Sequence, residues 1–159
     1  MSNCAIILAG GEGKRMKSNL PKPMSEVLGK PMLRWVIDSV KSAGVDDICV
    51  VKGYKKECID EFVSSLPFEV ETVYQAERLG TGHAVMMAKD FLEKHSGNVV
   101  ILNGDAPFMD AKTISDALAL HTEKGSVATV ISAKVSDPTG YGRTVSYTHL
   151  RAHETGRNL

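Results

Sequence analysis

Short apolar runs alternate with helical hydrophobic patterns along most of this chain, and this alternation limits its fold more than any other feature. The expected strands are residues 5–9, 48–51, 70–74, 99–102 and 127–135. The expected helices are residues 31–43, 58–66, 82–92 and 113–121. Such alternation predicts an α/β, Rossmann-like, mostly parallel sheet with helices on both faces. Ligands bind sheets of this kind at the carboxyl ends of the strands.

The composition is that of a single domain without a strong overall charge. The chain has 159 residues, with 19 Lys+Arg and 19 Asp+Glu, so no global field attracts nucleic acid or an anionic membrane. No apolar run approaches the roughly 20 residues of a membrane span. The three cysteines lack a C-x-x-C spacing, which argues against a disulfide framework or a zinc site. We therefore expect a cytoplasmic protein with no nucleic-acid or membrane partner.

The last fifteen residues, 145–159, follow neither the strand nor the helix period. The run 145–155 resembles the in-frame translation of a common transposon-type sequencing adapter. We therefore expect a domain at 3–144, which is the N-terminal part of a longer unit, and a non-native tail at 145–159. The alternative is a genuine polar tail. His149 and His153 have the spacing of a zinc pair on a helix, but we do not interpret them as a metal site.

The first candidate site is the glycine-rich loop at residues 8–16, which follows an expected strand. Glycines let backbone amides approach a ligand closely, and Lys14 and Arg15 add positive charge that suits phosphate oxygens. The loop matches neither the Walker pattern nor the dinucleotide fingerprint, which argues against a P-loop kinase and a dehydrogenase. The loop thus predicts phosphate binding, and the alternative is a tight surface turn.

Two charged residues stand next to expected turns. Lys22 lies between Pro21 and Pro23, which stiffen the backbone and hold the ammonium group in place for a phosphate. Asp105 follows an apolar strand, which delivers one carboxylate to the sheet edge, and Mg²⁺ prefers few carboxylates together with phosphate oxygens and water. The alternatives are a solvated lysine and an Asx turn.

The segment 75–84 contains Gln75 followed by Gly80 and Gly82 on either side of Thr81. This pattern predicts the start of a helix with free backbone amides, and the Gln75 amide can both donate to and accept from a base edge. The alternative is an ordinary helix start capped by Thr81. We expect His83 to pack or cap and not to act in catalysis.

These elements in this order resemble the nucleotidyltransferase domain of the sugar-nucleotide pyrophosphorylases. Segments 75–84 and 137–143 are similar to the bacterial N-acetylglucosamine-1-phosphate uridylyltransferases, the pyrophosphorylase half of bifunctional enzymes that make UDP-N-acetylglucosamine. The resemblance runs from Asn3 to Arg143. Asn103 stands where this family often has Tyr, and Pro23-Met24 stands where it commonly has Val-Leu. Both differences leave room for a related nucleotidylyltransferase.

The resemblance implies a role for each matching residue. Arg15 and Lys22 would act on the triphosphate in catalysis, and Asp105 would be the Mg²⁺ ligand. The residues implied in substrate binding are Leu8, Ala9, Gly10, Gly11, Lys22, Gln75, Gly80, Thr81, Asn103, Gly104, Asp105 and Gly142.

The implied reaction transfers a nucleotidyl group from UTP to N-acetylglucosamine 1-phosphate with Mg²⁺ as cofactor, and releases pyrophosphate. Its product serves peptidoglycan and lipopolysaccharide synthesis, and the full-length relative would be a homotrimer. Because the sugar pocket of the family lies beyond Arg143, we expect weak turnover from this chain. The alternatives are transfer to another sugar phosphate, a cytidine, thymidine or molybdopterin substrate, and a non-catalytic nucleotide-binding module of the same fold.

Overall fold

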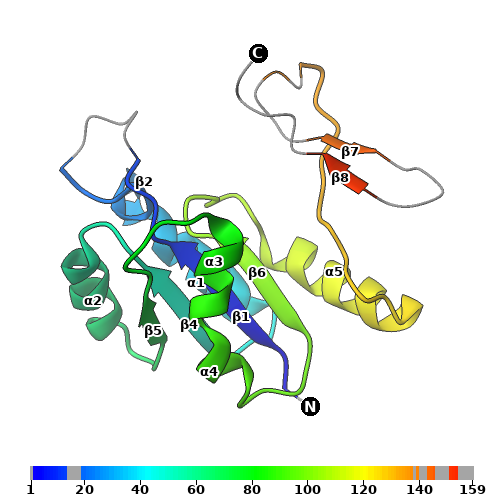
Figure 1. The fold of residues 1–159 in the computed structure, drawn as a ribbon, viewed down its shortest axis with the longest axis horizontal. Helices are drawn as coiled ribbons and strands as arrows, with labels where there is room; N and C mark the ends of the chain where they lie inside the picture. Colours follow the sequence, from blue (N-terminus) through cyan, green and yellow to red (C-terminus); the bar gives the residue numbers. More distant parts are fainter. Residues whose placement is uncertain (1, 14–18, 138, 140–142, 146–150, 154–159) are drawn as a thin grey trace.

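The computed structural model describes residues 2–13, 19–137, 139, 143–145 and 151–153. Its centre is a sheet of four parallel strands in the order β5-β4-β1-β6 (Figure 1). Their bounds are β1 Cys4–Ala9, β4 Asp47–Lys52, β5 Glu71–Tyr74 and β6 Val99–Asn103. The direction of the chain reverses across β1, since the first crossovers run to β4 and β5 and the next returns to β6. The predicted α/β parallel sheet is confirmed.

Helices cover both faces of this sheet (Figure 1). One face carries α1 Met32–Ser42, α2 Lys56–Ser64 and α5 Ala111–Lys124. The other face carries α3 Thr81–Met87 and α4 Lys89–Leu92. Successive β1 residues point to opposite faces, as the pleat requires, so Ile6 joins the core under α3 and α4 while Ile7 joins the core under α1.

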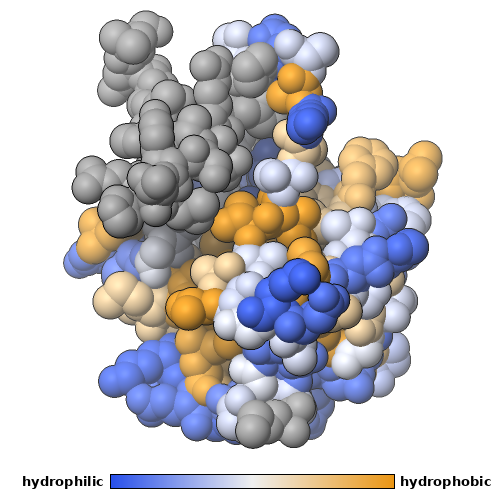
Figure 2. Space-filling view, turned by 90° about the vertical axis from the view of Figure 1, so that its right-hand side faces the viewer, coloured by the Kyte–Doolittle hydropathy of each residue, from blue (hydrophilic) through white to orange (hydrophobic). Residues whose placement is uncertain are grey.

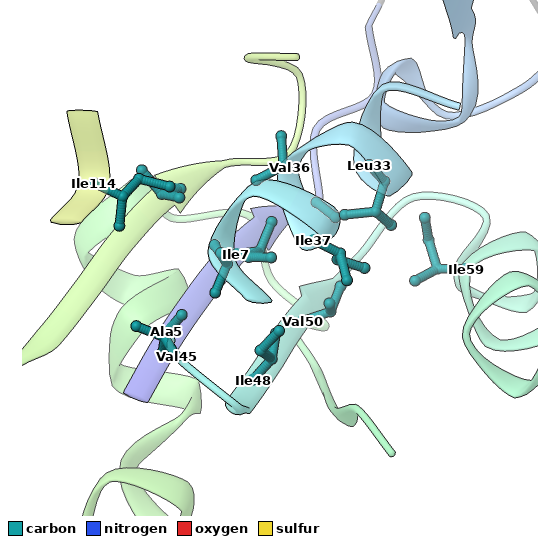
Figure 3. Packing of buried hydrophobic residues seen from close by; sticks show 13 residues of the cluster. Ala5, Ile7, Leu33, Val36, Ile37, Val45, Ile48, Val50, Ile59 and Ile114 are labelled. Carbon is teal, nitrogen blue, oxygen red and sulfur yellow. The ribbon is translucent and has the colours of Figure 1, made fainter. Parts of the chain in front are cut away.

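The larger core lies between β1, β4 and α1. In Figure 3, Ile37 of α1 points toward Ile7 of β1 and Val50 of β4, and all three side chains are fully buried. Leu33, Val36, Ile37 and Val40 form the apolar stripe that the helical period predicts. β1 and β4 are each covered on both faces and paired on both edges, so these two strands form the centre of the sheet.

The remaining elements are short. They are the 3-10 turn η2 Lys22–Met24, a hairpin of β2 Glu26–Val27 with β3 Lys30–Pro31, and a separate pair of β7 Arg143–Val145 with β8 Arg151–His153. The division into a domain at 3–144 and a tail at 145–159 stays a prediction. Among the helices of the described residues, none has the length and apolarity that a membrane crossing needs.

The structure differs from the expected elements in three places. The helix expected at 82–92 is broken at Ala88 into α3 and α4. Pro31 precedes the first turn of α1 and pairs with Glu26 in the hairpin. The strand expected at 127–135 is wrong, because none of these residues is in a strand and Val127 and Val130 are exposed. β-Branched residues form a strand only where a backbone partner is available, and no described strand lies against this segment.

The backbone just after β1 and the backbone just after β4 lie close together at Gly10 and Gly53. A Cβ atom on Gly53 would lie 2.7 Å from the carbonyl oxygen of Gly10 and 2.9 Å from its Cα. The amide of Tyr54 also donates a hydrogen bond to that carbonyl, at 3.3 Å. The backbone after β1 can therefore take this path only because residue 53 has no side chain.

Substitution of Gly53 tests this contact. We expect Gly53→Ala to lower the free energy of unfolding by about 2 kcal/mol, because the methyl group would overlap backbone atoms that cannot rotate away. The matched control is Gly82→Ala, since a Cβ there meets nothing within 4 Å in the described part of the chain. That control should leave stability unchanged or raise it by at most about 1 kcal/mol, because Gly82 lies in a helix. Urea denaturation measures both, and equal stabilities would contradict the close approach.

Two cysteines of the sheet are fully buried, Cys4 in β1 and Cys49 in β4. Burial raises the pKa of the Cys49 thiol from 9.0 to about 12, with smaller contributions from the charges of Glu71 and Cys4 and an opposing one from Lys94. The thiol therefore ionises more readily in the unfolded chain. Stability from this neutral group is present below pH 9.0 and is lost as the pH rises toward about 12.

We predict that the free energy of unfolding falls between about pH 8 and pH 10, and that Cys49→Ala removes about 1 kcal/mol of that fall. The matched control is Cys58→Ala, because Cys58 is only partly buried, and it should retain the wild-type slope. Urea denaturation at each pH measures the difference. A slope in Cys49→Ala as steep as that of the wild type would show that the buried thiol does not cause it.

Candidate functional site

A pocket of about 290 Å³ lies where β1, β5 and β6 end. Its position is the switch point of the sheet, where crossovers leave β1 in opposite directions and the loops separate. The pocket is lined by residues from four separate segments, namely Leu8, Gly10, Gly11, Gly13, Lys22, Pro23, Gln75, Arg78, Gly80, Thr81, Ala84, Asn103 and Asp105. Segments that are far apart in the sequence therefore share one site.

The loop after β1 forms one wall of this pocket. Gly13 has a φ of +62°, and a Cβ there would lie 2.9 Å from the Cβ of Lys22. The loop thus packs closely against Lys22 at the start of η2, and a side chain at residue 13 would collide with it. Lys14 and Arg15 lie outside the described residues, so the catalytic role expected for Arg15 stays a prediction.

An ion pair between Lys22 and Asp105 forms the floor of the site. Pro21 and Pro23 are both buried on either side of Lys22, and they fix the backbone that carries the ammonium group. Asp105 is placed by the turn after β6, where the amide of Gly104 donates to the carbonyl of Leu8 at 2.9 Å. Both charged side chains are about one-third exposed, so each can still meet a ligand in the pocket.

Gln75 also lines the pocket and is 5% exposed. Its backbone amide donates to the carbonyl of Lys52 at 2.9 Å, which extends the β4–β5 pairing by one residue. Its side-chain Nε2 lies 3.1 Å from the carbonyl oxygen of Gly80 and 3.0 Å from Nδ1 of His83. Gln75 therefore ties the end of β5 to the start of α3.

The segment that joins Gln75 to α3 crosses toward the glycine loop. Arg78 lines the pocket, and its Nη1 donates to Oε2 of Glu12 at 2.7 Å. Gly80 has a φ of +103° and accepts from the amide of Ala84 at 3.1 Å, so that Thr81 opens α3. The ion pair joins two loops that are 66 residues apart.

The structure brings together nine of the residues that the resemblance implied, which are Leu8, Gly10, Gly11, Lys22, Gln75, Gly80, Thr81, Asn103 and Asp105. Ala9 is fully buried beneath the loop and Gly104 is buried against Leu8, and neither lines the pocket. Gly142, like Arg15, lies outside the described residues. Which ligand atoms the nine residues contact stays a prediction.

Gly13 and Pro23, which were expected to shape the loop and to hold Lys22, also line the pocket, as do Arg78 and Ala84, for which no role was predicted. Arg78 could have been predicted as a site residue, because it is charged and lies inside the segment 75–84, which was expected to contribute to the site. Its position between Gln75 and Gly80 was a usable signal. Its partner Glu12 was not, because the pairing depends on how two distant loops fold against each other.

A larger hollow of about 690 Å³ lies between β6 and α5, on the side of the molecule that faces the viewer in Figure 2. Hydrophobic residues gather near the middle of this view. β6 is the edge strand here, and Val99 and Ile101 remain exposed on it. No Asp, Glu, Lys or Arg is among the described residues that line the hollow. The smaller pocket differs in this respect, because Lys22, Arg78 and Asp105 line it.

Comparison with known proteins identifies the family of this chain. Residues 4–154 match the family described as Nucleotidyl transferase. The bifunctional protein GlmU of Acetivibrio thermocellus is 45% identical over 141 residues, which are 89% of this chain and 30% of that protein. The chain thus spans about 30% of the length of this curated relative.

Solved structures of other proteins are also similar to this chain. UDP-glucose pyrophosphorylase from Acinetobacter baumanii has a TM-score of 0.66 at 20% identity, over 79% of this chain and 54% of that one, and this likeness shows the fold. CTP:phosphocholine cytidylyltransferase from Streptococcus pneumoniae (LicC) has a TM-score of 0.56 at 27% identity, over 66% of this chain and 46% of that one. The family match covers nearly the whole chain, and this chain therefore belongs to the nucleotidyl transferase family.

Proposed function

We propose that this chain forms the nucleotide-binding side of a uridylyltransferase site that makes UDP-N-acetylglucosamine from UTP and N-acetylglucosamine 1-phosphate. The observation that carries the proposal is the pocket in which the glycine loop after β1 meets the Lys22–Asp105 ion pair. The 45% identity to GlmU of Acetivibrio thermocellus supports the choice of a sugar nucleotide. We further propose that the whole protein acts as a homotrimer in the cytoplasm.

Lys22 is suited to hold a phosphate. An ammonium group has three N–H donors, and Asp105 leaves donors of Lys22 available for an oxygen that enters the pocket. The buried prolines on each side keep this group in one place, which lowers the entropic cost of binding. Gly10, Gly11 and Gly13 line the same pocket with backbone that carries no side chain, so a triphosphate can approach the main chain closely.

Asp105 fits a magnesium ion that is shared with the substrate. The described residues contain no group of three or more His, Cys, Asp or Glu side chains able to hold a metal, so a site made of protein alone is not formed there. Mg²⁺ commonly takes one or two carboxylates and completes its shell with phosphate oxygens and water. A bound Mg²⁺ would neutralise charge on the triphosphate, and Asp105 would hold it beside Lys22.

The proposed reaction needs no covalent enzyme intermediate. An oxygen of the sugar 1-phosphate forms a bond to the α-phosphorus of UTP, and the bond from that phosphorus to the bridging oxygen breaks. Pyrophosphate leaves with the electron pair. The chain contributes positioning by the glycine loop and charge stabilisation by Lys22. Arg15 would add to the second effect and Gly142 would approach the sugar.

A second candidate is cytidylyl transfer, because a structure at 27% identity is a CTP:phosphocholine cytidylyltransferase. The two candidates differ in the base that the pocket accepts and in the phosphate that attacks. Pyrophosphate release from UTP with N-acetylglucosamine 1-phosphate, measured beside CTP with phosphocholine, separates them. Binding of a nucleotide without any pyrophosphate release would favour a non-catalytic module.

The role of Asp105 is tested through the magnesium dependence of UTP binding. We expect Mg²⁺ to tighten binding of UTP to the wild-type chain, and Asp105→Asn to weaken binding in the presence of Mg²⁺ by on the order of ten-fold, because a charged ligand is lost. The matched control is Asp90→Asn, since Asp90 is exposed on α4 away from the pocket. Calorimetric titration with Mg²⁺ and with a chelator measures both. Equal Mg²⁺ dependence in the two variants would refute a metal site at Asp105.

A further inference from the structure

The side chains of Gln75, which lines the pocket, and His83, which is partly buried, lie within hydrogen-bond distance of each other. Gln75 follows β5 and is 5% exposed, while His83 lies in the first turn of α3. A single nitrogen of Gln75, Nε2, lies within hydrogen-bond distance of two groups, the carbonyl oxygen of Gly80 at 3.1 Å and Nδ1 of His83 at 3.0 Å. This double contact determines where the protons must be.

The proton positions follow from the chemistry of the three groups. A carbonyl oxygen can only accept, so the group that faces Gly80 must be the NH₂ of the Gln75 amide and not its oxygen. The second N–H of the same NH₂ then points to His83. Nδ1 of His83 then accepts this hydrogen bond, which places the ring proton on Nε2.

We propose that His83 is a positioning residue, which holds the Gln75 amide in one orientation and thereby determines which base edge the pocket accepts. A free glutamine amide can turn over and exchange its donor and acceptor ends. Here the reverse orientation would place the amide oxygen against the carbonyl of Gly80 and against the lone pair of His83 Nδ1. The contact with Gly80 would join two acceptors in every case, and the contact with His83 would do so as long as the ring proton is on Nε2, so the two contacts together fix the amide.

The fixed orientation leaves the other end of the amide toward the pocket. Oε1 of Gln75 lies 3.2 Å from the position that a Cβ of Gly10 would take, and both residues line the pocket. The bare backbone at Gly10 therefore leaves room beside this oxygen. The pocket presents a hydrogen-bond acceptor at this point and no donor from Gln75.

An acceptor at this point favours a base that offers an N–H. Uracil has a proton on N3 and can donate it to the oxygen of Gln75. N3 of cytosine is an acceptor, so it would face that oxygen without a hydrogen bond. A polar group built for one hydrogen bond discriminates strongly against an analogue that cannot make it. This step rests on the proposed function, since it requires the base to lie beside Gln75. The family fold alone does not select the base, because a relative at 27% identity is a CTP enzyme by name.

The first experiment needs no nucleotide. Long-range ¹H–¹⁵N correlation on the ¹⁵N-labelled chain at about pH 7.5 reports the tautomer of each histidine ring. We expect the neutral ring with the proton on Nε2 for His83, and no His83 signal of this kind in His83→Asn, which assigns it. A proton on Nδ1, or a doubly protonated ring, would overturn the proposed pair whether or not UTP binds.

The second experiment compares two variants of nearly equal shape. In His83→Asn the side-chain oxygen can occupy the place of Nδ1 and accept from Gln75, whereas His83→Leu has no acceptor. We expect the wild type and His83→Asn to bind UTP more tightly than CTP, and His83→Leu to lose that preference by about ten-fold. Calorimetric titration of both nucleotides gives the ratio of the two dissociation constants, and urea denaturation confirms that both variants are folded.

The outcomes separate this inference from the proposed function. A ratio in His83→Leu equal to that of the wild type would overturn the positioning role, since packing alone would then account for His83. Equal losses in His83→Asn and His83→Leu would do the same. A wild-type chain that binds neither nucleotide would overturn the proposed function and the base selection built on it, while the tautomer would still decide the pairing of His83 with Gln75.

Discussion

The pairing of β1 with a parallel strand on each edge is the constraint on which the rest of the structure depends. β4 and β6 both pair with β1 in register over most of its length, and helices cover both of its faces. The strand has no freedom to shift, so the backbone that leaves it at Gly10 starts from a defined point. The close approach of Gly53 then limits the direction in which the loop can go.

The site is assembled from interactions that join distant parts of the chain. Lys22 and Asp105 are 83 residues apart, and Arg78 and Glu12 are 66 apart. Each pair is partly exposed, so its net contribution to stability is small, about 0–1 kcal/mol. Their importance lies in position, because they hold cationic and anionic groups around a pocket whose backbone is set by the sheet. The Gln75–His83 pair does the same for an amide that would otherwise be free to turn.

Local patterns predicted most of the elements, because within a short segment the residues that become buried recur at the spacing of a strand or a helix. The stripe on α1 and the apolar run of β1 are examples, since each is read from residues that are neighbours in the sequence. The segment 127–135 shows where this reasoning fails. Its β-branched residues favour a strand, but a strand also needs a backbone partner, and pattern alone cannot supply one. The break at Ala88 is a similar case, because the apolar period continues across it.

The sequence by itself determined the fold class, the succession of the four strands of the central sheet along the chain, and most of the residues that line the pocket, because these depend on local periodicity and on motifs at strand ends. Tertiary structure alone decided that Lys22 pairs with Asp105, that Arg78 meets Glu12, and that Ala9 and Gly104 lie behind the pocket. Such contacts depend on distances between segments that the sheet brings together, and no local pattern encodes those distances.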